Sequence, residues 1–73
     1  MTAEQLRAEI DSLTDDIEFS FNGIQGAICP FSRGNISVSY GNEERTFFSI
    51  DEVMNTPFID GKPIKEICTQ FEF

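Results

Sequence analysis

Residues 17–28, which read IEFSFNGIQGAI, decide the fold of this chain. The apolar residues of the first half alternate with polar ones, which is the pattern of a half-buried β-strand. Asn22-Gly23 tolerates the positive φ angles of a type I′ turn, so the next residues should return antiparallel to the first strand. Counting outward from this turn pairs Phe21 with Ile24, Phe19 with Gly26, and Ile17 with Ile28. The stretch predicts a β-hairpin with one apolar face, in which Gly26 leaves room for the Phe19 ring.

A helix is predicted before this hairpin. Thr2-Ala3-Glu4-Gln5 has the form of a capping box, in which the Thr and Gln side chains satisfy backbone N–H groups at a helix start. Apolar residues follow at spacings of three or four, namely Leu6, Ile10, Leu13 and Ile17. This narrow stripe indicates an amphipathic helix with one face against the core.

Two further strands are expected after the hairpin. Pro30 has no N–H for a sheet ladder, and together with residues 32–34 it predicts a loop that ends the second strand. Residues 36–40 alternate Ile, Val and Tyr with serines, residues 41–44 turn the chain, and residues 46–48 return as a fourth strand. A four-stranded antiparallel meander is the simplest arrangement.

The C-terminal third predicts short helices. Ser49 and Glu52 repeat the capping pattern and begin a short helix that Pro57 ends, and a turn at Asp60-Gly61 follows. A last amphipathic helix is predicted after Pro63 from the spacing of Ile64, Ile67, Cys68 and Phe71. Residues 1–73 are therefore expected to form one small α+β domain: an N-terminal helix, an antiparallel sheet of three to four strands, and one or two short C-terminal helices.

Charge limits the partners that this chain can bind. Thirteen acidic residues oppose five basic ones, for a formal net charge of −8. This charge disfavours binding to nucleic acids and to anionic membranes and favours a protein partner with a basic surface. The chain begins without the basic and apolar segments of a signal peptide, and no apolar run approaches the ~20 residues of a membrane span, so we expect a cytoplasmic location. The oligomeric state stays open.

No catalytic constellation is recognisable. The chain has no histidine, which removes the commonest general base and neutral metal ligand. Its two cysteines, Cys29 and Cys68, lie among apolar neighbours, where a thiolate is disfavoured. Phosphate-binding glycine loops and calcium loops are also missing. We expect no enzyme activity, no cofactor and no metal site; the alternative, a redox or nucleophilic cysteine, predicts an accessible thiol of lowered pKa.

Two sets of residues are candidate contact surfaces. The first is an acidic stretch at the helix-to-strand junction: Glu9, Asp11, Asp15, Asp16 and Glu18. Acids at a helix C-terminus oppose the helix dipole, and sequences tend to break local rules at functional sites. A solvated face that serves solubility is the competing interpretation. The second set is aromatic: Phe31, Phe47, Phe48 and Phe58. Adjacent Phe47 and Phe48 must point to opposite sheet faces, so either helices cover both faces or an apolar patch awaits a partner.

The order of motifs resembles a known group of proteins. The motifs are Asp16-Ile17-Glu18-Phe19 before Asn22-Gly23, then Phe48 to Asn55, Ile59-Asp60-Gly61-Lys62, and Ile64-Lys65-Glu66-Ile67. They resemble small uncharacterised acidic proteins of Gram-positive bacteria and of their prophage and conjugative elements. These residues are turn, cap and core residues, so the resemblance implies a fold and a genetic setting but no activity.

Two functions are compatible with these features. The leading expectation is a non-catalytic protein-interaction module, because the chain offers surfaces and no chemistry. The alternative is an acidic mimic of nucleic acid that inhibits a host defence nuclease of the restriction or CRISPR type, which the net charge of −8 on a small chain suggests.

Overall fold

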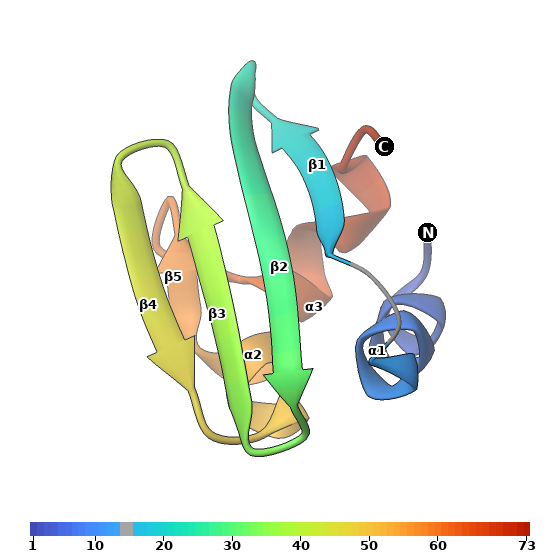
Figure 1. Cartoon of the computed structure of the whole chain (residues 1–73). Coiled ribbons are helices and arrows are strands. Elements are labelled where there is room, and N and C mark those ends of the chain that lie inside the picture. The colour runs from blue at the N-terminus through green and yellow to red at the C-terminus, as the bar shows by residue number, and fades with distance from the viewer. Residues whose placement is uncertain (14–15) are drawn as a thin grey trace.

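The computed structural model describes residues 1–13 and 16–73, and in that part of the chain an antiparallel sheet has helices packed behind it (Figure 1). The elements are α1 (Ala3–Ser12), β1 (Ile17–Phe21), β2 (Ile24–Ser32), β3 (Asn35–Tyr40), β4 (Glu43–Phe47), α2 (Ile50–Asn55), β5 (Pro57–Ile59), β6 (Lys62–Pro63), α3 (Ile64–Ile67) and a 3-10 helix (Cys68–Gln70). Strands β1 to β4 pair in chain order, which confirms the α+β class and the predicted meander.

The predicted hairpin and its register are confirmed. The paired residues are Phe21 with Ile24, Phe19 with Gly26, and Ile17 with Ile28. Asn22 and Gly23 at its tip have φ angles of 54° and 76°, the left-handed values that a type I′ turn needs. A Cβ atom added to Gly26 would lie 2.6 Å from Cζ of Phe19, so glycine here does leave room for the ring.

The predicted loop begins later than expected, because Pro30 belongs to β2, whereas Arg33 and Gly34 do form a turn. Strand β2 continues through Pro30, which pairs with Ile36, and ends at Ser32. Strand β1 pairs with β2 only as far as Ile28, so within the described part of the chain Pro30 has a strand partner only on the β3 side. Proline is tolerated at sheet edges and bulges, and the register shifts between Pro30 and Ser32.

Side-chain caps position the first two helices. In α1 the backbone N–H of Gln5 donates to Oγ1 of Thr2 at 3.2 Å. The side-chain Oε1 of Gln5 accepts from the backbone N–H of Thr2 at 2.9 Å, as the capping box predicts. The helix ends at Leu13 in a left-handed conformation, so Ile17 belongs to β1 and not to the helical stripe. At α2 the Ser49 hydroxyl caps the N–H of Glu52 at 3.1 Å.

The C-terminal segment differs most from expectation. The last helix is shorter than predicted, because α3 and the 3-10 helix end before Phe71, whose backbone is extended. Glu72 then forms an antiparallel bridge with Ser20 at the outer edge of β1. The short hairpin β5–β6 around the Asp60-Gly61 turn was not predicted as strands.

The core lies between the sheet and the helices. Its buried hydrophobic residues are Leu6, Ile10, Phe19, Phe21, Ile28, Ile36, Val38, Tyr40, Phe47, Val53, Met54, Ile59, Ile64, Ile67, Cys68 and Phe71. Phe71 stacks on Phe19 with ring centroids 4.1 Å apart and 8° between the ring planes. The residues on the opposite face of the sheet do not belong to this core.

Candidate functional site

One face of the four-stranded sheet carries no other layer in the described part of the chain. Helices α2 and α3 and the β5–β6 hairpin lie behind the sheet in Figure 1, which looks onto the uncovered side. The burial of β3 shows the alternation, since Ile36, Val38 and Tyr40 are buried whereas Ser37 and Ser39 are half-buried. The uncovered residues, here called the outer face, are Glu18, Ser20, Ala27, Cys29, Ser37, Ser39, Glu44 and Thr46.

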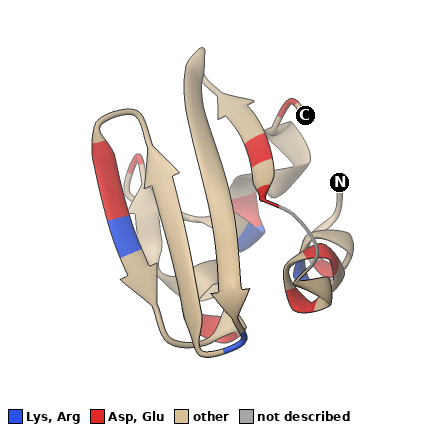
Figure 2. Cartoon of the chain, in the orientation of Figure 1, with Lys and Arg blue, Asp and Glu red and all other residues tan. Residues whose placement is uncertain are grey.

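The outer face has an uncharged centre and acidic flanks. Strands β2 and β3 contain no charged residue, whereas acids lie on β1 and β4 at either side (Figure 2). The register forms one row across the sheet, in the order Glu18, Ala27, Ser39 and Glu44. Three strand spacings of roughly 4.8 Å lie between the two ends of this row, so the backbones of Glu18 and Glu44 are about 14 Å apart. Asp16 directly precedes β1 on the Glu18 side.

Cys29 lies on this face in an environment that disfavours its thiolate. Burial raises the pKa of the Cys29 thiol, and the negative charge of Asp16, a hydrogen bond to Asp16 and the charges of Glu44 and Glu18 raise it further. Cys68 is buried in the core on the other side of the sheet, where burial also raises its pKa. Neither thiol has the lowered pKa that a nucleophilic or redox role predicts.

The structure divides the predicted acidic stretch between two elements. Glu9 and Asp11 are exposed on α1, and the Asp11 carboxylate accepts from Nε of Arg33 at 2.6 Å. Asp16 and Glu18 are exposed beside the outer face. Asp15 lies outside the described residues. Sequence reasoning missed Glu44, although the register of the fourth strand could have placed it opposite Glu18.

The residues of the predicted aromatic surface differ in their exposure. Phe47 is buried in the core, so its assignment as a contact residue is wrong; its place opposite Ile36 turns it toward the helices. Phe58 is half-buried and packs edge-on against Phe47 with centroids 6.2 Å apart. Phe31 and Phe48 are each 70% exposed, at the end of β2 and directly after β4. These two rings therefore extend one end of the sheet with accessible apolar surface.

Metal-binding clusters and membrane-spanning helices are both absent from the described residues. Residues 1–13 and 16–73 contain no group of three His, Cys, Asp or Glu side chains that could hold a metal ion. Within the same ranges no helix has the length and apolar character to span a membrane.

Known proteins offer no guide to the function. No protein-family model matches the chain, and no curated protein or solved structure matches it significantly.

Proposed function

We propose that this protein is a non-catalytic interaction module that binds a basic protein partner through the outer face of its sheet. The observation that carries the proposal is the charge pattern of this face: an uncharged centre of small side chains between flanks of carboxylates. Protein interfaces are depleted of charged residues at their centre and have a polar rim.

The small side chains favour close approach by a partner. Ala27, Ser37 and Ser39 project little from the sheet, and the two serine hydroxyls can donate and accept hydrogen bonds. The exposed rings of Phe31 and Phe48 supply aromatic anchors of the kind that interfaces favour. The flanking acids raise the association rate of a basic partner and set its orientation more than they add affinity.

The same charge pattern favours this function over the acidic mimic of nucleic acid. Duplex DNA carries roughly one negative charge per 1.7 Å of its axis. A mimic needs a comparably dense array of carboxylates, whereas the acids of the outer face stand only on its flanks. A nuclease inhibited by the protein in purified form would revive the alternative.

The first experiment uses Cys29 to find the partner. A photoreactive group attached to Cys29 at mildly alkaline pH points away from the helices, while Cys68 is buried and stays unlabelled. Illumination in extract should crosslink a basic protein, which is then purified for quantitative binding. In the purified complex, alkylation of Cys29 should be at least tenfold slower than in the free protein. An unchanged alkylation rate would place the partner elsewhere.

Matched charge variants decide whether the outer face carries the binding. The double variant Glu18→Gln/Glu44→Gln removes two carboxylates from the outer face and should weaken the affinity for the purified partner about five- to tenfold, mostly through the association rate. Its affinity should also depend less on salt. The control Glu4→Gln/Glu9→Gln removes two exposed carboxylates from α1 and should change the affinity less than twofold. Equal effects of the two doubles would reduce the binding to net charge and refute the site.

A further inference from the structure

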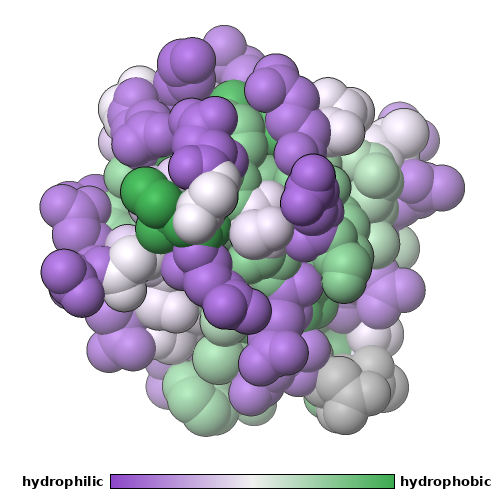
Figure 3. All heavy atoms as spheres, turned by 90° about the horizontal axis from the view of Figure 1, so that it is seen from above, coloured by the Kyte–Doolittle hydropathy of each residue, from purple (hydrophilic) through white to green (hydrophobic). Residues whose placement is uncertain are grey.

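A pocket lies at the end of the molecule where three turns meet. The turns of β1–β2, β3–β4 and β5–β6 each contain residues with left-handed backbone, among them Asn22, Gly41 and Asp60. The Asn22 side-chain amide donates to Oδ2 of Asp60 at 3.1 Å, which ties the first turn to the third. Figure 3 looks onto this end and shows hydrophobic surface exposed between hydrophilic residues. The open pocket between the β3–β4 turn and the β5–β6 turn has a volume of about 660 Å³, within the range of small-molecule sites.

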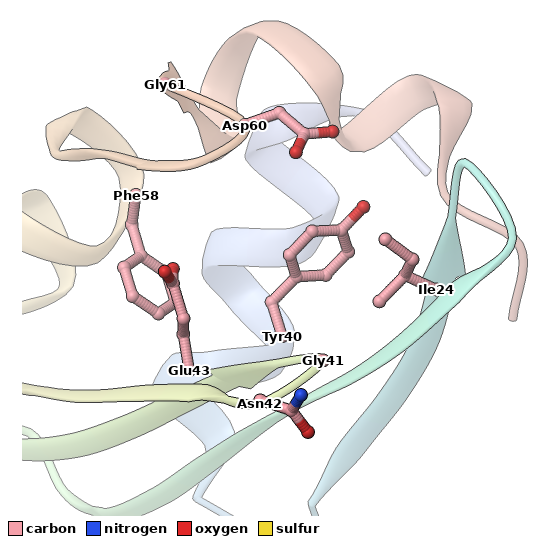
Figure 4. A pocket seen from close by; sticks show the side chains of 8 residues that line it. All are labelled: Ile24, Tyr40, Gly41, Asn42, Glu43, Phe58, Asp60 and Gly61. Carbon is pink, nitrogen blue, oxygen red and sulfur yellow. The ribbon is translucent and has the colours of Figure 1, made fainter.

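The pocket combines aromatic and apolar walls with carboxylates. Tyr40, Phe58 and Ile24 supply the walls, and Glu43 and Asp60 supply the carboxylates (Figure 4). The Asp60 carboxylate is directed toward the Tyr40 hydroxyl. No Lys or Arg lines the pocket, and among the described residues neither carboxylate pairs with a basic side chain.

We infer that this pocket binds an organic cation, an alkylguanidinium or alkylammonium group presented by a side chain or by a free amine. Carboxylates pair with such a group, and aromatic rings attract a cation that lies over their faces. The guanidinium of Arg45 lies 5.6 Å from the centroid of Phe58, so one cation of the chain itself already approaches this ring. Ile24 offers apolar surface for the alkyl stem.

The chain contains a built-in reporter for this binding. Tyr40 is its single tyrosine, and it has no tryptophan, so intrinsic tyrosine fluorescence comes from a residue that lines the pocket. N-acetyl-arginine amide should change this fluorescence saturably, with a Kd of roughly millimolar for a ligand of this size. N-acetyl-citrulline amide, which has the same shape but no charge, should bind at least tenfold more weakly. Equal responses to the two compounds would overturn the inference.

A second titration distinguishes the two sources of the cation. Agmatine carries the same guanidinium together with a free ammonium group and so has two positive charges, whereas the blocked arginine has one and stands for a side chain of a protein. Tighter binding of agmatine that persists at high salt, where the extra charge is screened, assigns the pocket to free amines, and tighter binding of the blocked arginine assigns it to a protein side chain. If neither compound changes the Tyr40 signal, the pocket is not a cation site.

Single variants test the roles of the two carboxylates. Glu43→Gln and Asp60→Asn should each weaken binding of N-acetyl-arginine amide at least threefold. Asparagine tolerates the φ of 53° at position 60, so this variant should keep its fold. Glu66→Gln removes the same charge from an exposed residue of α3 that does not line the pocket, and it should leave the affinity unchanged. If Glu66→Gln weakens binding as much as Glu43→Gln, only net charge matters. The pocket and the outer face involve different residues, so either proposal can fail alone.

Discussion

Among individual residues, Tyr40 connects the sheet to the pocket. Its hydroxyl donates to the Phe21 carbonyl at 2.8 Å. Burial raises the pKa of Tyr40 above its ordinary value of 10.0, and the Asp60 carboxylate raises it further through its charge and its interaction with the hydroxyl. A negative neighbour disfavours the phenolate, so the protonated form is favoured in the folded protein.

The change Asp60→Asn should therefore lower the pKa of Tyr40 toward the ordinary value. Following tyrosinate absorbance against pH measures this pKa directly, because the chain has no second tyrosine. Glu9→Gln on α1 is the control and should leave the titration curve in place. A curve unaffected by Asp60→Asn would mean that the carboxylate stands away from the hydroxyl in solution.

Cys29 allows a second prediction for a single residue. Its pKa is raised above 9.0, and the thiolate is the reactive form, so alkylation should be slow at neutral pH and accelerate as the pH rises through the raised pKa. Asp16→Asn removes a negative neighbour, lowers the pKa and should speed alkylation several-fold at a fixed mildly alkaline pH. Glu66→Gln on α3 should not change the rate. Rapid labelling of the native protein at neutral pH would contradict this account.

At the level of elements, the sequence predicted the features that depend on neighbouring residues and missed those that depend on tertiary contacts. The turn type, register and apolar face of the first hairpin follow from Asn22-Gly23 and alternation, and all three are confirmed. The end of the second strand was predicted too early at Pro30. A strand tolerates a proline where its neighbour does not need the missing N–H, and this depends on how far β1 reaches along β2, which is a tertiary property. The bridge between Glu72 and Ser20 joins residues far apart in the chain, and no local pattern announces it.

Of the candidate sites, the sequence could predict which residues share a face or an end of the sheet, but not how the other elements pack against them. Alternation required Phe47 and Phe48 to face opposite sides, but their sequence does not say which side the helices cover. In a four-stranded meander the β1–β2 turn and the β3–β4 turn fall at the same end of the sheet, so Asn22-Gly23 and Gly41-Asn42 could have been placed together. The approach of Asp60-Gly61, which completes the pocket, depends on how β5 and β6 pack, and a single sequence carries no signal for it.

Gly26 provides a test of the hairpin as an element. In Gly26→Ala the new Cβ would meet Cζ of Phe19 and the backbone O of Ser39, each at 2.6 Å, so the ring and two strands must shift. Overpacking of this kind costs about 1–3 kcal/mol in the free energy of unfolding, measurable by urea denaturation. Gly34→Ala is the control, because its new Cβ would lie 3.8 Å from the backbone O of Phe48, an ordinary van der Waals distance. Equal losses in the two variants would show that the strands relax around position 26.

Across the whole molecule, charged residues and backbone pairing protect the two edges of the sheet. The free edge at β4 carries Glu43, Glu44 and Arg45, and charged edges resist pairing with another strand. At the other edge, Ser20 exchanges two backbone hydrogen bonds with Glu72, of 2.8 and 2.9 Å. Extension of the sheet by a partner strand is therefore disfavoured at both edges. A partner that docks on the face avoids this obstacle.

The C-terminal segment should be part of the same cooperative unit as the sheet. Phe71 is buried against Phe19 and lies 5.7 Å from the Phe21 centroid, although it stands near the chain end. Phe71→Ala should lower the free energy of unfolding by about 3–5 kcal/mol, a large share of the stability of so small a domain. Phe73→Ala truncates a ring that is 59% exposed and should cost far less. Denaturant titration of both variants measures the difference. If Phe71→Ala costs no more than Phe73→Ala, the segment frays in solution and the bridge to Ser20 does not protect the edge of β1.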